Sequence, residues 1–218
     1  MKPLKLYELT LSPNNVKVRI ALGLKGLEYE RVPVPLDDFP GDRSLPVKVS
    51  TQPRLPVLTH GETVIFDSGA ILRYLDANFP ETHQLFSSDH AELGEIEGWE
   101  FWAKTELSPP TGMIFQQAFG GSVDESVCAE ARRLMHEATG RIEEILATQD
   151  YLLGNEPKAP DVVCAPVISL TLMPPEAAAL GPIPAAFQKH FQLGEGRDRT
   201  RAWVARMMAH DAALAHTS

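Results

Sequence analysis

The sequence predicts an α/β domain over residues 1–78 and an all-α domain over residues 89–218, with a linker at 79–88 between them. Two observations favour this division. Before residue 78, short runs rich in β-branched and aromatic residues alternate with helical patterns, whereas beyond residue 89 apolar residues recur at helical spacing. A chain of 218 residues with 44% hydrophobic content is long enough to build two small domains with real cores.

The chain begins with a predicted β-α-β unit. Residues 4–9 and 27–34 are the expected strands, and residues 16–24 are a helix because Val, Ile and Leu recur at helical spacing. Two strands joined through a helix are expected to pair in parallel. The segment between the first strand and the helix places Ser12 at the mouth of that helix, which is expected to begin near Asn14.

A proline-rich stretch over residues 35–53 follows and shows no clear period, so it predicts a loop with at most a short helix near residues 44–49. The next residues predict a hairpin. Pro56 opens its first strand, a short turn contains Gly61, and residues 63–66 form the second strand.

A helix is predicted directly after the hairpin. Ile71, Leu72 and Leu75 recur at helical spacing, and Asp67-Ser68 stands before them, where N-capping residues belong. A helix N-terminus carries free N–H groups and the positive end of the helix dipole, so this junction is suited to binding a carboxylate.

Long helical patterns occupy the second domain. They cover residues 89–119, 124–149 and 199–210, and the prolines at 109 and 110 are expected to bend or break the first of them. Residues 173–196 are rich in Pro, Ala and Gly and give no clear prediction.

Charge and cysteine content exclude several classes of function. A formal net charge of −9 argues against nucleic acid or an anionic membrane as the main partner. The sequence shows neither a membrane span nor a signal-peptide pattern, so a cytoplasmic protein is expected. Cys128 and Cys164 stand 36 positions apart in apolar helical patterns, which predicts buried thiols rather than a disulfide framework, and no metal site is expected.

The residues around the hairpin resemble a known family. The order Pro-Val-Leu, short turn, hydrophobic strand and Asp67-Ser68 before Ile-Leu-x-Tyr-Leu is similar to the glutathione-binding half of the thioredoxin-like domain in cytosolic glutathione S-transferases. The run Ser-Pro-Asn-x-x-Lys-Val from Ser12 resembles the Ser/Thr-type members, which we group here as theta/nu-like and bacterial. This resemblance implies a thioredoxin-like N-terminal domain, an all-α C-terminal domain, glutathione as co-substrate and a homodimer.

The resemblance also implies roles for particular glutathione-binding residues. Leu55 would offer its main-chain N–H and C=O to the cysteinyl part of glutathione, and Pro56 would be cis. Asp67 would bind the ammonium group and Ser68 the α-carboxylate of the γ-glutamyl end. The glycine carboxylate would have to meet one of the nearby positive or amide groups, which are those of Arg43, Lys48, Gln52 and Arg54.

Three residues compete for the role of stabilising the glutathione sulfur. A thiol has a pKa near 8.5. A hydroxyl that donates a hydrogen bond to the sulfur, together with a helix N-terminus, is enough to lower that pKa. Ser12 is the hydroxyl that the sequence offers there, Asn14 would assist through its amide, and Tyr7 is the rival because other classes use a tyrosine at the end of the first strand. An ordinary helix N-cap explains the position of Ser12 equally well.

Two departures from the family pattern leave the function open. Ser50-Thr51-Gln52-Pro53 replaces the usual Asn-Pro-x-Gly, and Lys158 replaces a Ser or Thr cap three positions before Asp161. The expected function is conjugation of glutathione to a small electrophile. The alternatives are a glutathione-dependent isomerase or dehalogenase, and a non-catalytic protein that binds glutathione or an apolar ligand.

Overall fold

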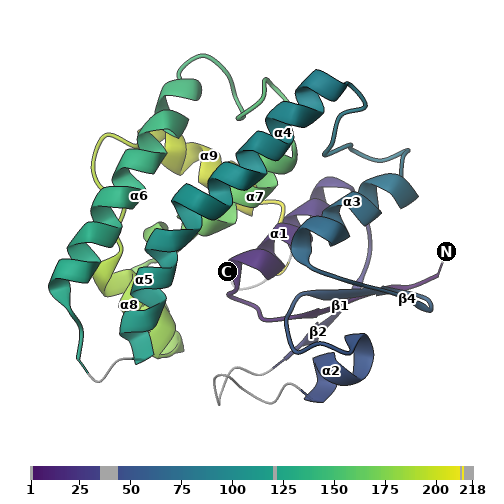
Figure 1. The fold of residues 1–218 in the computed structure, drawn as a ribbon, viewed down its shortest axis with the longest axis horizontal. Coiled ribbons are helices and arrows are strands. Elements are labelled where there is room, and N and C mark those ends of the chain that lie inside the picture. The colour runs from purple at the N-terminus through teal and green to yellow at the C-terminus, as the bar shows by residue number, and fades with distance from the viewer. Residues whose placement is uncertain (1, 35–43, 120–121, 212, 214–218) are drawn as a thin grey trace. The chain divides into compact units, whose positions relative to one another are not determined.

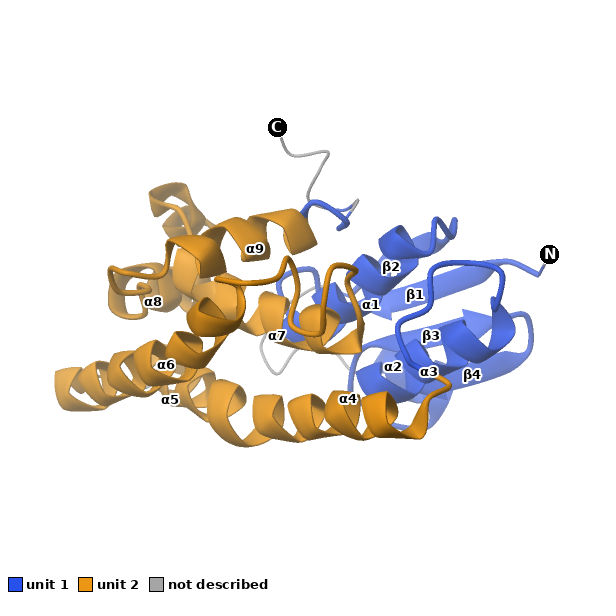
Figure 2. Cartoon of the chain, turned by 90° about the horizontal axis from the view of Figure 1, so that it is seen from above, with its two compact units in different colours: residues 1–87, 209–218 blue, residues 88–208 orange. Residues whose placement is uncertain are grey.

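The computed structural model describes residues 2–34, 44–119, 122–211 and 213. The chain divides into two compact units, one of residues 1–87 with 209–218 and one of residues 88–208, coloured separately in Figure 2. In the part of the chain that is described, no helix combines the length and the apolar character needed to cross a membrane.

The first unit contains a four-stranded mixed sheet in the order β2-β1-β3-β4. Its strands are β1 (Leu4–Glu8), β2 (Glu30–Pro33), β3 (Val57–His60) and β4 (Thr63–Phe66). β1 pairs in parallel with β2 and antiparallel with β3, and β3 pairs antiparallel with β4. The predicted β-α-β unit and the predicted hairpin are therefore both present, and the α/β thioredoxin-like fold class is confirmed.

Three helices accompany the sheet: α1 (Pro13–Leu24), α2 (Ser44–Ser50) and α3 (Ser68–Asn78). α1 and α3 lie on one side of the sheet and α2 on the other (Figure 1). Most predicted core residues of α1 and α3 are fully or almost fully buried, as are Leu6 of β1 and Leu58 of β3, whereas Leu24 at the end of α1 is half-buried. The predicted helix starts earlier than expected, at Pro13, because proline at the first helical position has its φ already set for a helix.

The regular elements described in the second unit are all helices. Its α-helices are α4 (His90–Trp102), α5 (Ser108–Phe119), α6 (Glu125–Ile145), α7 (Ala159–Ser169), α8 (Pro182–His190) and α9 (Asp198–Met208). A π-helical segment at Ala103–Leu107 separates α4 from α5, immediately before the prolines predicted to disturb the helix. Short 3₁₀ helices at Leu170–Leu172 and Pro175–Leu180 connect α7 to α8.

Asp161 organises the centre of this unit. Its fully buried carboxylate accepts hydrogen bonds from the N–H groups of Leu152 and Lys158, each at 2.9 Å, and from Trp203 Nε1 of α9 at 2.8 Å. The Lys158 side chain has no acceptor with which to cap α7, and it pairs with Glu92 of α4 instead. Asp161 thus supplies half of a capping box in the absence of a Ser or Thr cap.

The end of the chain differs from the expected domain boundary. The described residues after α9 belong to the first unit rather than to the helical one. Asp211 is fully buried there and forms a two-point ion pair with Arg19 of α1, at 2.8 Å from Nε and 2.8 Å from Nη2. No local sequence pattern links two residues that stand 192 positions apart.

Candidate functional site

Strand register gathers the predicted site segments at one end of the sheet. Tyr7 near the end of β1 pairs with Val57 at the start of β3, and Val57 pairs with Phe66 at the end of β4. The loop to Ser12, the residues before β3 and the Asp67-Ser68 junction therefore leave the sheet from the same end. These three strand positions span two inter-strand steps, about 10 Å, roughly the length of an extended tripeptide.

Ser12 caps α1 through its backbone only. Its carbonyl accepts hydrogen bonds from the N–H groups of Asn15 at 2.9 Å and Val16 at 3.0 Å, and its extended backbone ends the preceding loop. Its hydroxyl makes no capping hydrogen bond. The simple N-cap interpretation therefore does not account for the Ser12 side chain, which lies half-buried at the positive end of a helix of 12 residues.

Asn14 and Tyr7 are placed differently from Ser12. Asn14 is exposed in the first turn of α1, and its Oδ1 accepts a hydrogen bond from Lys17 at 2.9 Å. That bond leaves the amide nitrogen of Asn14 as the group able to donate. Tyr7 neighbours Glu8 in β1, and successive strand side chains face opposite sides of the sheet. Glu8 contacts Arg19 of α1, so Tyr7 faces away from that helix.

The peptide bond between Leu55 and Pro56 is cis, as the resemblance implied. Pro56 is buried immediately before β3, while Leu55 is half-buried. The Gln52 side chain shapes the loop that leads to them. It accepts from the Arg54 N–H at 2.7 Å and donates to the Arg54 carbonyl at 2.7 Å and to Ser50 Oγ at 3.0 Å.

These bonds separate the groups considered for the glycine carboxylate of glutathione. The Gln52 amide is engaged within its own loop, whereas Arg54 and Lys48 carry exposed side chains. Arg43 lies outside the described residues. Arg54 directly precedes Leu55 in the chain and is therefore the cation nearest the cis bond in sequence.

The Asp67-Ser68 junction forms the start of α3, as predicted. Asp67 Oδ1 accepts a hydrogen bond from the Ala70 N–H at 3.1 Å, and the Asp67 carbonyl accepts from the Ile71 N–H at 3.0 Å. Asp67 has a φ of 73°, a backbone conformation that residues other than Gly, Asn and Asp rarely adopt. The Asp67 side chain is exposed, and the N–H groups of the first helical residues have no partner inside the helix.

A buried arginine that sequence reasoning missed supports the loop before Ser12. Arg19 is fully buried, and its Nη2 donates to the Thr10 carbonyl at 2.8 Å. Burial alone would lower the pKa of Arg19, but its bonds to Asp211 and Glu8 outweigh burial and raise it. One signal in the sequence could have found Arg19. It is a charged residue between Val18 and Ile20 in a helix predicted to be well buried, and a buried charge needs partners.

Asn15 of α1 also binds the loop before Ser12. It is fully buried, and its Oδ1 accepts a hydrogen bond from the Leu9 N–H at 3.1 Å. Its amide nitrogen is buried without a partner among the described residues. The predicted site loop is thus fixed by two buried side chains of α1, neither of which was predicted as a site residue.

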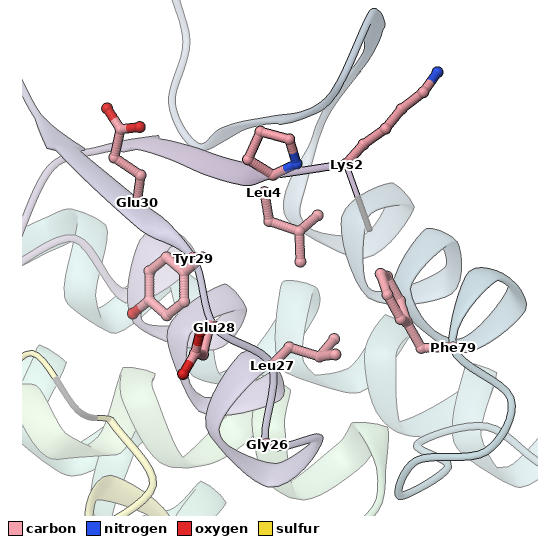
Figure 3. Close-up of a pocket in the computed structure, with 9 residues that line it drawn as sticks. Lys2, Leu4, Gly26, Leu27, Glu28, Tyr29, Glu30 and Phe79 are labelled. Carbon is pink, nitrogen blue, oxygen red and sulfur yellow. The ribbon is translucent and has the colours of Figure 1, made fainter.

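A separate cavity of about 610 Å³ occurs in the first unit (Figure 3). It is lined by Lys2–Leu4, Gly26–Glu30 and Phe79, and Figure 3 shows Leu4, Leu27 and Phe79 around the opening. These segments include the starts of β1 and β2, so the cavity lies at the opposite end of the sheet from Ser12. None of the predicted glutathione-binding residues lines it.

One group of described residues brings three possible metal ligands together in the second unit. The ligand atoms of Glu125, Cys128 and His190 all lie within 4.8 Å of one another. His190 Nδ1 lies 2.8 Å from Glu125 Oε1, and Glu125 occupies the first turn of α6, where a carboxylate is favoured. Burial raises the pKa of the Cys128 thiol, which disfavours the thiolate that a metal binds. We interpret the group as a hydrogen-bonded pair beside a buried thiol.

Comparisons with known proteins place the sequence and the fold of the chain among glutathione S-transferases. The sequence profile described as "Glutathione S-transferase, N-terminal domain" matches residues 6–83. The chain is 31% identical to glutathione S-transferase 3 of Zea mays, over 72% of each chain. It is 27% identical to maleylacetoacetate isomerase of Pseudomonas aeruginosa, over 75% of this chain and 79% of that one. The crystal structure of rice GST1 in complex with glutathione superimposes with a TM-score of 0.75 and 22% identity, over 100% of this chain and 92% of that one.

Proposed function

The chain belongs to the glutathione S-transferase family, and from this premise we propose that it binds glutathione, holds it as the thiolate and conjugates it to a small electrophile. One observation carries the proposal. The Ser12 hydroxyl makes no capping hydrogen bond, and it stands at the amino end of α1, at the same end of the sheet as Pro56 and Asp67-Ser68.

The proposed catalytic step needs no base. Lowering the thiol pKa by one to two units requires about 1.4–2.7 kcal/mol of preference for the anion. A hydroxyl donated to a charged sulfur contributes roughly 1.5–3 kcal/mol, and a helix N-terminus adds about 0.3–1 kcal/mol. Ser12 takes the leading role and the Asn14 amide assists. The orientation of Tyr7, on the sheet face away from α1, favours Ser12 over Tyr7.

The remaining site residues bind glutathione. Main-chain groups of Leu55, fixed by the cis bond to Pro56, pair with the cysteinyl backbone of glutathione. Asp67 binds the ammonium group, and the N-terminus of α3 with Ser68 binds the α-carboxylate. Arg54 takes the glycine carboxylate, while Gln52 shapes the loop that presents Arg54.

We further propose a cytoplasmic homodimer of the Ser/Thr type, theta/nu-like in the run from Ser12. An exposed apolar patch in the first unit supports a protein partner. The patch lies on α2 and β4, which contact each other, and its members are Leu45, Val47, Val64 and Phe66, with exposed fractions of 38–49%. Glutathione and a small electrophile are its proposed small-molecule ligands.

Ultraviolet absorption of bound thiolate tests the catalytic role of Ser12. The wild-type protein with glutathione is expected to show thiolate absorption near neutral pH, and Ser12→Ala is expected to raise the bound-thiol pKa by about one unit or more. Asn14→Ala is expected to shift the pKa less, and Tyr7→Phe is the matched control that leaves it unchanged. Thiolate absorption that survives in Ser12→Ala and disappears in Tyr7→Phe would transfer the role to Tyr7.

The Pseudomonas relative favours a second candidate function, the glutathione-dependent isomerisation of a small unsaturated acid. In an isomerisation the thiolate adds to the substrate and is then eliminated, so glutathione is regenerated, whereas conjugation consumes it. Measuring free thiol during turnover of maleylacetoacetate and of a model electrophile separates the two reactions. Tight binding of glutathione without turnover of either would favour the non-catalytic alternative.

A further inference from the structure

A buried ion cluster connects the end of the chain to the proposed site. Arg19 is its centre, and its polar contacts with other described residues lie inside the first unit. It donates to both carboxylate oxygens of Asp211 and to Glu8, and these three side chains are fully buried. Glu8 also accepts from Arg31 of β2 at 2.7 Å, so the cluster joins α1, the sheet and the C-terminal segment.

The same arginine fixes the backbone that leads to Ser12. Arg19 Nη2 donates at 2.8 Å to the Thr10 carbonyl and at 2.8 Å to Asp211 Oδ2. Thr10 is two residues before Ser12, and the Ser12 N–H donates to the Leu9 carbonyl at 3.1 Å. Asp211 therefore restrains the guanidinium plane that in turn restrains the loop at Leu9–Ser12.

The C-terminal segment docks on α1 at a second, uncharged point. A Cβ atom placed on Gly23 would lie 2.0 Å from the His210 carbonyl oxygen. The helix thus approaches the backbone of the segment more closely than any other residue would allow. The Asp211 carboxylate also accepts a hydrogen bond from the Ala213 N–H at 3.0 Å, so it has a partner within its own segment as well.

We propose that Asp211 is a positioning residue for the Ser12 site and acts through Arg19 on the Leu9–Ser12 loop. This inference rests on the proposed function, because its consequence is the placement of the Ser12 hydroxyl against the glutathione sulfur. Asp211 itself does not touch the ligand. Without the Asp211 charge, Arg19 keeps Glu8 as its one carboxylate partner among the described residues, and its hydrogen bond to the Thr10 carbonyl is less well fixed.

Two variants release the segment by different physical routes. Asp211→Asn removes the charge at nearly constant size, and Gly23→Ala blocks the approach of the His210 carbonyl without altering any charge. Asp76→Asn is the matched control. It weakens another buried ion pair, formed with Lys25 just after α1 at 2.7 Å, and it leaves the Leu9–Ser12 loop untouched.

Two measurements distinguish this inference from the proposed function. The first is hydrogen exchange of the Leu9–Ser12 amides in the protein without ligand. The second is the pKa of the bound glutathione thiol. In both Asp211→Asn and Gly23→Ala, exchange of the loop amides is expected to become faster and the bound-thiol pKa to rise by about one unit, which is tenfold less thiolate below that pKa. Asp211→Glu is expected to recover part of both effects.

The inference is overturned if both releasing variants keep wild-type loop exchange and a wild-type thiol pKa. It is also overturned if loop exchange rises while the thiol pKa stays constant, or if Asp76→Asn produces the same two shifts. A wild-type protein that binds no thiolate contradicts the proposed function instead. In that case loop exchange in Asp211→Asn and Gly23→Ala alone decides whether Asp211 positions the loop.

Discussion

At the scale of single residues, buried polar side chains do most of the organising. Asp161 accepts hydrogen bonds from three residues in the second unit, and Arg19 donates hydrogen bonds to three residues in the first. A buried donor or acceptor that loses its partner costs far more than the net value of the bond it made. These residues therefore dominate the response of each unit to mutation.

Replacing Asp161 by alanine is expected to destabilise the second unit by at least about 3 kcal/mol, because two buried N–H donors and one part-buried N–H donor lose their acceptor at about 1–3 kcal/mol each. Urea unfolding measures the effect through the transition midpoint. Trp203→Phe is the comparison, since it removes one of the three donors and keeps an aromatic ring. Equal losses for the two variants would show that the carboxylate is not the organising group.

Sequence reasoning predicted the residues proposed to contact glutathione but not the buried residue that supports them. Ser12, Pro56 and Asp67-Ser68 were predicted because each stands at a junction where the local pattern changes from strand to helix or from loop to strand. Arg19 was missed as a functional residue because its partners come from two segments that only the fold brings together, Glu8 with Thr10 and the distant Asp211. Local periodicity contains no information about such partners.

At the scale of elements, short sequence signals predicted where most helices and strands lie. The hairpin at β3 and β4 followed from its turn and β-branched residues, and the disturbed helix before α5 followed from its two prolines. α8 was not predicted because prolines stand at its first and third positions and its segment lacks a long apolar period. Contact with α5 and the preceding 3₁₀ turn stabilises α8 where local propensity does not.

Helix α9 is connected to α6 through Glu143, and this contact predicts a pH dependence. The Glu143 carboxylate accepts from the Thr200 N–H and hydroxyl, each at 2.8 Å, and from the Arg199 N–H at 3.1 Å. Burial opposes ionisation of Glu143, but these bonds outweigh burial and lower its pKa below the ordinary 4.5. An acid whose pKa is lowered by folding stabilises the protein above its unfolded-state pKa, and this stabilisation is lost as the pH falls through the folded-state value.

The free energy of unfolding is therefore expected to fall below about pH 5 more steeply in the wild-type protein than in Glu143→Gln. Chemical denaturation at a series of pH values measures both slopes. Glu144→Gln, an exposed neighbour in the same helix, is the matched control for the change in net charge. Identical slopes for wild type and Glu143→Gln would contradict this account of how α6 holds the start of α9.

At the scale of the whole molecule, the chain divides into two compact units, and the described residues after α9 belong to the first of them. The apolar pattern of residues 199–210 correctly indicated a helix, α9. It gave no reason for the residues after it to join the first unit, since that contact depends on the Arg19–Asp211 ion pair. The exposed patch of Leu45, Val47, Val64 and Phe66 also belongs to this scale, because contiguous exposed apolar side chains are a feature of protein interaction surfaces.

The proposed homodimer predicts that the double variant Val47→Lys with Val64→Lys is monomeric, because two buried cations per subunit would meet no partner. Sedimentation equilibrium measures the change in mass. Leu180→Lys is the control, since Leu180 is 67% exposed in the second unit and lies outside the patch. A wild-type protein that sediments as a monomer, or a double variant that sediments as a dimer, would contradict the proposed interface.

Gly23 has a consequence for attempts to engineer this protein. Replacing helical glycines by alanine is a common route to thermostability, worth up to about 1 kcal/mol per site from helix propensity. At position 23 the space for a methyl group is already taken by the His210 carbonyl oxygen. A stability design that scores α1 as an isolated helix would choose alanine there and would push the segment at His210 away from α1.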